Sequence, residues 1–119
     1  MKPYVYKCTL ERVVDGDTID VTISLGFDIC LHKQRLRLHG IDTPECRTRN
    51  LAEKKLGKAA AARLAELCAH KFKIESLGRG KYGRILAIPF TADDEDICKI
   101  LIKEGHAVEY FGGKKTKVW

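Results

Sequence analysis

A clean alternation of apolar and polar side chains runs through one stretch, Asp17-Thr18-Ile19-Asp20-Val21-Thr22-Ile23-Ser24-Leu25. A period of two is typical of a β-strand, because successive side chains of a strand point to opposite faces. The apolar residues of the stretch therefore share one face, which is expected in the core. Asp17 has the parity of that apolar face. Because burying an unpaired carboxylate costs several kcal/mol, we expect Asp17 to meet a partner where the strand begins.

The segments on either side of this stretch predict two further strands. Residues 4–14 alternate in the same way, and Asp15-Gly16 marks the turn that follows them. Residues 27–41 predict a third strand, but its apolar residues change from odd to even positions midway. A one-residue bulge near Lys33-Gln34 would reconcile the two halves. The next residues, Thr43-Pro44, end this strand, because proline lacks an amide hydrogen.

The second half of the chain predicts helices between shorter strands. The clearest helix covers residues 50–69, where Asn50 can cap the first turn and Glu53 completes a capping box. Strands are expected from Phe72 and over residues 85–90. A second helix is expected over residues 93–104, since acidic residues at its start suit the helix dipole. The apolar stripe of the first helix has helical spacing and consists of Leu56, Ala60, Leu64 and Leu67.

This order of elements predicts an α+β fold. Five antiparallel strands with an interposed helix suit a small closed barrel of the OB type, with two to three α-helices packed on it. A chain of 119 residues fits one domain. We expect that domain over residues 1–111, followed by a short basic tail over residues 112–119.

Composition narrows the class of protein. The net charge of +6 favours polyanionic partners such as nucleic acid, although a charged surface also serves solubility. The five cysteines are odd in number and show no Cys-x-x-Cys spacing, so neither a disulfide framework nor a zinc site is indicated. No apolar run suits a membrane span, and the first residues lack the apolar core of a signal peptide. We therefore expect a cytoplasmic monomer with no membrane partner.

Acids and arginines occur at strand ends that a barrel could bring together. Asp17 and Asp42 each follow an apolar strand face, and Glu45 comes three residues after Asp42. Two neighbouring carboxylates repel each other unless a cation lies between them, and oxygen ligands favour calcium or magnesium over zinc. A further carboxylate can take a proton from water, while Arg37 and Arg84 can bind a phosphate through paired donors. Together these groups indicate hydrolysis of a phosphate ester.

Each part of this set also has a plainer interpretation. The Asp-Gly and Thr-Pro pairs are common turn residues, and the glycine-punctuated segment 78–84 is compatible with an ordinary hairpin turn. An arginine on a strand is usually a solvated surface charge. In a regular strand the parity of Arg37, opposite to that of Asp42, would aim it away from the metal unless the barrel bends there.

Three motifs, in this order, resemble those of the staphylococcal nuclease family. They are Val14-Asp15-Gly16-Asp17-Thr18, then Arg37-Leu38-His39-Gly40-Ile41-Asp42-Thr43-Pro44-Glu45, and then Lys81-Tyr82-Gly83-Arg84. The resemblance extends from about residue 4 to Tyr110. It implies that residues 1–111 form a nuclease-like domain with an OB-type barrel. It also implies a calcium-dependent nuclease that cuts DNA or RNA and leaves 3′-phosphate ends.

The resemblance also implies a role for each matching residue. Calcium would be held by the carboxylates of Asp17 and Asp42 and by the backbone carbonyl of Thr43. Glu45 would be the general base. The remaining residues would contact phosphate or nucleotide: Arg37 and Arg84 at the scissile phosphate, Lys81 and Tyr82 at a neighbouring phosphate, and Tyr110 at the nucleotide pocket.

Two other functions remain open at this point. One is a non-catalytic module that binds nucleic acid or protein, although the acids and arginines of the motifs are all present here. Replacing Glu45 with Gln discriminates, because an enzyme loses rate while a binder has no rate to lose. The other is an OB-type protein that coats single strands, which would need exposed aromatic residues on the barrel.

For Asp17→Ala or Asp42→Ala we expect weaker calcium binding and lost cleavage, with folding that survives or improves as repulsion is relieved.

Overall fold

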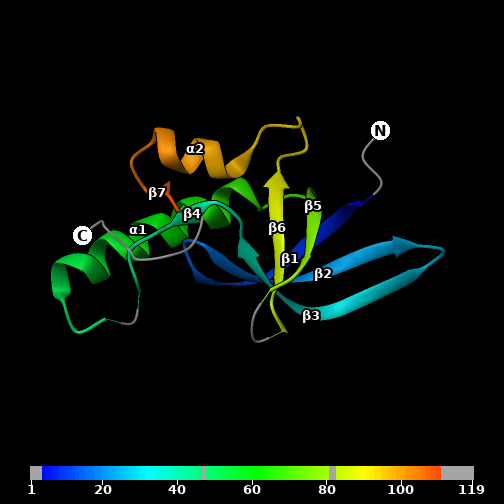
Figure 1. The fold of residues 1–119 in the computed structure, drawn as a ribbon, viewed down its shortest axis with the longest axis horizontal. Helices are drawn as coiled ribbons and strands as arrows, with labels where there is room; N and C mark the ends of the chain where they lie inside the picture. The colour runs from blue at the N-terminus through cyan, green and yellow to red at the C-terminus, as the bar shows by residue number, and fades with distance from the viewer. Residues whose placement is uncertain (1–3, 47, 81–82, 111–119) are drawn as a thin grey trace.

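The computed structural model describes residues 4–46, 48–80 and 83–110. Its elements follow in this order: β1 (Val5–Asp15), β2 (Thr18–Gly26), β3 (Ile29–Leu38), β4 (Ile41–Asp42), α1 (Leu51–Leu67), β5 (Phe72–Arg79), β6 (Ile85–Phe90), α2 (Ile97–Lys103) and β7 (Val108–Glu109). Five strands close a barrel in the order β1-β2-β3-β6-β5, and β4 pairs with β7. The helices and the β4–β7 pair lie toward one side, and the β2–β3 hairpin extends on the other (Figure 1). The predicted α+β class with a five-stranded barrel is confirmed.

One pair of barrel strands is parallel, where the sequence predicted antiparallel pairs throughout. β3 and β6 run in the same direction, with Leu36 opposite Ile85 and Leu38 opposite Ala87. The reason is geometric, because strand directions cannot alternate all the way around a closed ring of five. The other four neighbouring pairs are antiparallel.

The β2–β3 hairpin carries the alternation seen in the sequence. Ile19, Val21 and Ile23 are buried as expected. The predicted bulge is confirmed, since Val21 pairs with Gln34 and Ile23 with Leu31, which leaves two residues of β3 between these partners and only one of β2. The expected third strand from residue 27 to 41 is wrong at both ends, since β3 covers only Ile29–Leu38.

Two turns shorten that strand. Phe27 and Asp28 both have positive φ, 56° and 60°, and form the hairpin turn, so Phe27 is 97% exposed rather than in the core. At the other end, β3 stops at Leu38, and Gly40 turns the chain with a φ of 83° before β4 begins. This second turn separates Arg37 from Asp42.

The two helices differ from their predicted extents. Asn50 caps α1 as expected, accepting a hydrogen bond from the Glu53 amide. The buried positions of α1 are Gly57, Ala60 and Leu64, whereas Leu56 is 46% exposed. α2 begins at Ile97 with Asp96 as its cap, later than predicted. The acidic residues before it form a turn in which Asp94 has a φ of 64°, which a right-handed helix excludes.

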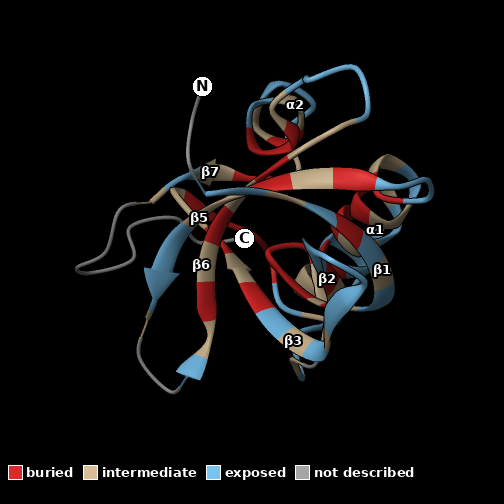
Figure 2. Ribbon diagram, turned by 90° about the vertical axis from the view of Figure 1, so that its right-hand side faces the viewer, coloured by how far each residue is buried: buried red, intermediate tan, exposed pale blue. Residues whose placement is uncertain are grey.

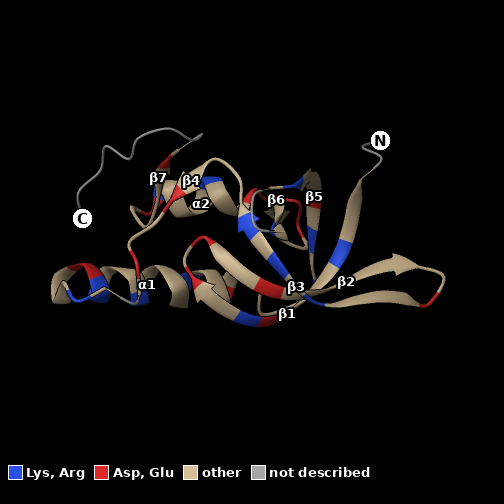
Figure 3. Ribbon diagram, turned by 60° about the horizontal axis from the view of Figure 1, so that its bottom comes forward, with Lys and Arg blue, Asp and Glu red and all other residues tan. Residues whose placement is uncertain are grey.

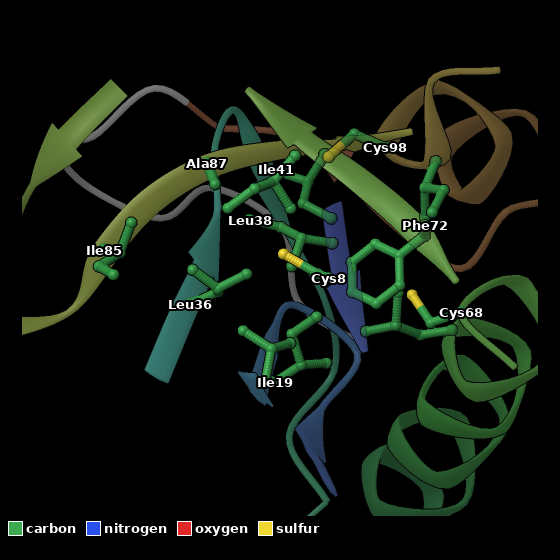
Figure 4. Close-up of a cluster of buried hydrophobic side chains, with 14 of the residues drawn as sticks. Cys8, Ile19, Leu36, Leu38, Ile41, Cys68, Phe72, Ile85, Ala87 and Cys98 are labelled. Atoms are coloured by element: carbon green, nitrogen blue, oxygen red, sulfur yellow. The ribbon is translucent and has the colours of Figure 1, made fainter. Parts of the chain in front are cut away.

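The core fills the barrel and the space beneath the helices. Buried residues recur on alternate positions of β6, marked by red bands in Figure 2, and on alternate positions of β2 from Ile19 to Ile23. Three cysteines, Cys8, Cys68 and Cys98, lie in this core with Phe72 (Figure 4). Burial raises the pKa of each of these thiols to about 12, so they remain neutral and behave as apolar side chains. None of the described helices is long and apolar enough to cross a membrane.

Candidate active site

The predicted site residues converge on one pocket. It has a volume of about 330 Å³ and is lined by Asp15, Asp17, Thr18, Arg37, Asp42, Thr43, Glu45, Arg84 and Tyr110. All of the predicted residues that the structure describes are in this lining. Lys81 and Tyr82 lie outside the described residues. The sequence does not predict Asp15 and Thr18 as site residues, although both belong to the Asp15-Gly16-Asp17-Thr18 motif.

Asp17 accepts several hydrogen bonds at the pocket. It is 9% exposed, in keeping with its apolar parity just before β2. Its Oδ1 accepts a hydrogen bond from the Thr18 hydroxyl at 3.0 Å, and its Oδ2 accepts one from the Thr43 amide at 3.3 Å. Its Oδ2 also lies 3.6 Å from an Arg37 nitrogen. Asp17 therefore ties the start of β2 to the end of β4.

Arg37 is held by the turn that ends β3. Its Nη1 donates to the Leu38 carbonyl at 2.7 Å, and its Nη2 donates to the Ile41 carbonyl at 2.8 Å. The side chain is only 16% exposed, so it is not a solvated surface charge. The turn at Gly40 brings the Ile41 carbonyl back to the guanidinium group. Arg37 thus faces the same pocket as Asp42 despite its opposite parity.

The β4–β7 pair places Asp42 and Tyr110 at the pocket. Asp42 is 3% exposed and lies opposite Val108 in the ladder. Just beyond the ladder, the Tyr110 amide donates to the Gly40 carbonyl at 2.9 Å. This strand contact brings the C-terminal part of the described chain to a site formed mainly by its first half.

Glu45 is exposed, in contrast to the two aspartates. Its backbone amide donates to the Glu53 Oε2 at 3.1 Å, and the next amide, that of Cys46, donates to the Asp15 Oδ1 at 3.1 Å. Burial, with a smaller effect from its hydrogen bond to Asp15, raises the pKa of the Cys46 thiol to about 11. This thiol therefore stays neutral near pH 7.

Arg84 reaches the pocket from the segment that precedes β6. Its carbonyl accepts a hydrogen bond from the Gly80 amide at 2.7 Å, which closes the described ends of the glycine-rich loop. Basic and acidic segments occur together at this end of the barrel, beside α1 (Figure 3). Among the described lining residues, four carboxylates accompany two guanidinium groups, so acidic groups outnumber basic ones there by two.

The donor set fits a hard divalent cation. Asp17 and Asp42 supply two buried carboxylates, and neither histidine nor cysteine is among the described lining residues. The Thr43 hydroxyl oxygen is buried and has no hydrogen-bond partner among the described residues. Oxygen donors of this kind suit calcium or magnesium. Among the described residues, neither this pocket nor any other part of the chain brings three His, Cys, Asp or Glu side chains together as a metal cluster, so a cation here would rest on the two aspartates and the Thr43 oxygens.

Comparison with known proteins places these features in a family. The chain is 34% identical over 103 residues to the succinoglycan biosynthesis protein ExoI of Rhizobium meliloti, a match that covers 82% of this chain and 49% of that protein. It is 38% identical over 114 residues to the SPbeta prophage-derived endonuclease YokF of Bacillus subtilis, covering 92% of this chain and 36% of the relative. It is 35% identical over 101 residues to the thermonuclease of Staphylococcus intermedius, covering 82% and 56%.

This chain therefore spans about half of these relatives' length or less. The family model described as staphylococcal nuclease homologue matches residues 35–118. That range includes Arg37, Asp42, Thr43, Glu45 and Arg84 of the pocket. Since the match covers well over half of the chain, the protein belongs to the staphylococcal nuclease family.

Proposed function

We propose that this chain is a calcium-dependent nuclease that hydrolyses phosphodiester bonds of DNA or RNA. The observation that carries the proposal is the meeting of two buried aspartates, an exposed glutamate and two arginines in one pocket. Two relatives named as an endonuclease and a thermonuclease support the same reaction class.

The charge of the pocket favours a divalent cation as part of the site. A phosphodiester is an anion, and the described lining residues already carry two more acidic than basic groups. Coulomb repulsion in a partly buried site opposes such a substrate, whereas a bound divalent cation cancels the excess. Asp17, Asp42 and the Thr43 carbonyl would hold calcium, which would supply an electrophile for the phosphate oxygens.

The side chains then divide the remaining work. Glu45 takes a proton from the attacking water while the oxygen of that water bonds to phosphorus. Arg37 and Arg84 donate hydrogen bonds to the phosphate oxygens and stabilise the negative charge of the pentacoordinate transition state. Arg37 has five N–H donors, of which two bind the Leu38 and Ile41 carbonyls, so its fork is already oriented when substrate arrives.

The products follow from which bond breaks. Cleavage of the bond between phosphorus and the 5′ oxygen leaves the phosphate on the 3′ end, and the departing 5′ oxygen takes a proton from solvent with Arg84 assisting. Tyr110 would line the nucleotide pocket. Lys81 and Tyr82, whose structure is not described, are proposed to contact a neighbouring phosphate.

Cleavage of denatured DNA and of RNA by the purified protein tests the proposal. The protein is incubated with calcium, with magnesium, or with a calcium chelator, and the ends of the products are identified. We expect calcium-dependent degradation to 3′-phosphate ends. The matched variant Glu45→Gln should lose orders of magnitude in kcat while still binding nucleic acid. Binding without cleavage under any metal would instead favour a non-catalytic nuclease-like module.

A further inference from the structure

The segment that carries Glu45 is held through its backbone by three carboxylates. The amides of Thr43, Glu45 and Cys46 donate to Asp17, Glu53 and Asp15 respectively, at 3.1 to 3.3 Å. The remaining residue of the segment, Pro44, has no amide hydrogen. Every backbone donor from residue 43 to 46 is therefore bound to an acidic side chain. Two of these acids belong to the β1–β2 turn, and the third belongs to α1.

Glu53 makes this contact instead of the one its position predicts. As the third residue of α1, it would complete a capping box by accepting from the Asn50 amide. The Asn50 amide donates to the Thr48 hydroxyl at 3.2 Å, and the Glu53 Oε2 accepts from the Glu45 amide. Half of the capping box is thus kept, because the Glu53 amide still binds the Asn50 side chain. The other half is used to hold Glu45.

A second feature of α1 holds the same residue. A Cβ at Gly57 would come within 2.5 Å of the Glu45 carbonyl oxygen and 2.6 Å of its carbonyl carbon. Only glycine lets the helix approach the backbone so closely. Gly57 lies four residues after Glu53, so both are on one face of the helix. That face therefore contacts Glu45 at its amide through Glu53 and at its carbonyl through Gly57.

We propose that Glu53 is a positioning residue for Glu45, acting with Gly57 to fix the backbone from which the catalytic carboxylate projects. This positioning role rests on the proposed function, and Glu53 lies outside the described pocket lining. Glu45 is exposed, so packing around its side chain does little to fix it. Since a misplacement of about 1 Å costs about 100-fold in rate, its position must be set by the backbone.

Three variants of the full chain test this role. Glu53→Ala removes the acceptor, whereas Glu53→Gln keeps an oxygen that can accept from the Glu45 amide. Glu66→Ala is the matched control, since Glu66 is an exposed acid of the same helix whose side chain binds Arg63. We expect Glu53→Ala to lower kcat by about 10- to 100-fold with little change in KM. Glu53→Gln should restore most of kcat, and Glu66→Ala should leave it unchanged.

Amide hydrogen exchange gives a readout that does not depend on activity. In NMR spectra of the metal-free protein, the Glu45 amide should exchange at least about 10-fold faster in Glu53→Ala than in wild type or Glu53→Gln. Gly57→Ala provides a second approach if Glu53→Ala folds poorly. It favours the helix intrinsically, yet it should lower kcat because the Glu45 carbonyl must move.

The outcomes separate this inference from the proposed function. A wild type that cleaves, with a Glu53→Ala variant that keeps both its kcat and its Glu45 exchange rate, overturns the positioning role alone. Equal loss of kcat in Glu53→Gln and Glu53→Ala would also overturn it, because the charge rather than the hydrogen bond would then matter. A wild type that binds nucleic acid without cleaving it would overturn the proposed function and the catalytic part of this inference together.

Discussion

Replacing Asp17 with Ala tests whether this carboxylate supports the fold as well as the metal. From the sequence, removal of one of two crowded acids should leave the metal-free protein equally or more stable. The structure reverses that expectation, because Asp17 accepts hydrogen bonds from the Thr18 hydroxyl and the Thr43 amide and lies 3.6 Å from Arg37. The variant leaves these buried donors without their acceptor.

The size of the effect follows from these contacts. Two hydrogen bonds to a charged group contribute about 3 kcal/mol at the low end of their range. Asp17→Ala relieves repulsion from Asp42 but also loses the attraction of Arg37, 3.6 Å away, and these two effects oppose each other in the same partly buried site. We therefore expect the hydrogen bonds to decide, so that Asp17→Ala lowers the free energy of unfolding by about 3 kcal/mol and the Tm by about 12 °C. Asp17→Asn, which keeps one acceptor oxygen, should lose about half as much.

Urea denaturation with a calcium chelator measures this difference in the free energy of unfolding. Repeating it with calcium gives the stability that calcium binding adds. At a calcium concentration of 100 times Kd, the wild type should gain about 2.7 kcal/mol, and Asp17→Ala should gain much less. Equal or greater stability of Asp17→Ala in the chelator would refute the argument that its hydrogen bonds outweigh repulsion. If calcium stabilised Asp17→Ala as much as the wild type, the assignment of Asp17 as a metal ligand would be refuted.

Four further predictions concern the rest of the fold. Phe27→Asn should raise the free energy of unfolding by about 1 kcal/mol in urea, because Phe27 is exposed at a φ of 56°; no gain would argue against strain there. Gly16→Ala should lower it by about 1–3 kcal/mol, since the new Cβ would lie 2.8 Å from the Ala60 Cβ, and wild-type stability would contradict this. A thiol reagent should modify exposed Cys30 in the native protein and buried Cys8 only on unfolding. Because burial raises the pKa of Cys8 from 9.0 to about 12, the unfolded chain releases this proton first. Stability should therefore fall from about pH 9 upward, by up to about 1.4 kcal/mol per pH unit for this thiol, and a flat profile in alkaline urea titrations would contradict it.

The fold could be predicted where local pattern and tertiary structure agree. Alternation from Ile19 to Ile23 identified the buried face of β2, and a change of parity located the bulge in β3. The parallel β3–β6 pair could not be predicted, because it follows from the closure of five strands and not from any local residue. The exposed position of Phe27 could not be predicted either, because a bulky apolar residue rarely occupies a left-handed hairpin turn.

The pocket could be anticipated from its motifs, but its internal geometry could not. The parity of Asp17 predicted its burial, which the structure bears out. The parity of Arg37 argued against its place in the site, because the turn at Gly40 is invisible to a count along one strand. The sequence predicts a capping box for Glu53 and not its bond to Glu45, because that bond depends on how α1 docks. Local periodicity carries no information about contacts between segments that are distant in the sequence.

The way Glu45 is held suits the role proposed for it. Its amide is hydrogen-bonded and its carbonyl lies against Gly57, while its carboxylate makes no hydrogen bond to another described residue. A general base needs an accessible oxygen for water, yet it also needs a fixed position relative to the phosphate. Holding the backbone satisfies both requirements, because the constraints leave the carboxylate oxygens available. A hydrogen bond to the carboxylate itself, as Asp17 accepts, would stabilise the charged form and make it a weaker base. On this argument, the buried and connected Asp17 suits a ligand, and the exposed Glu45 on a fixed backbone suits a base.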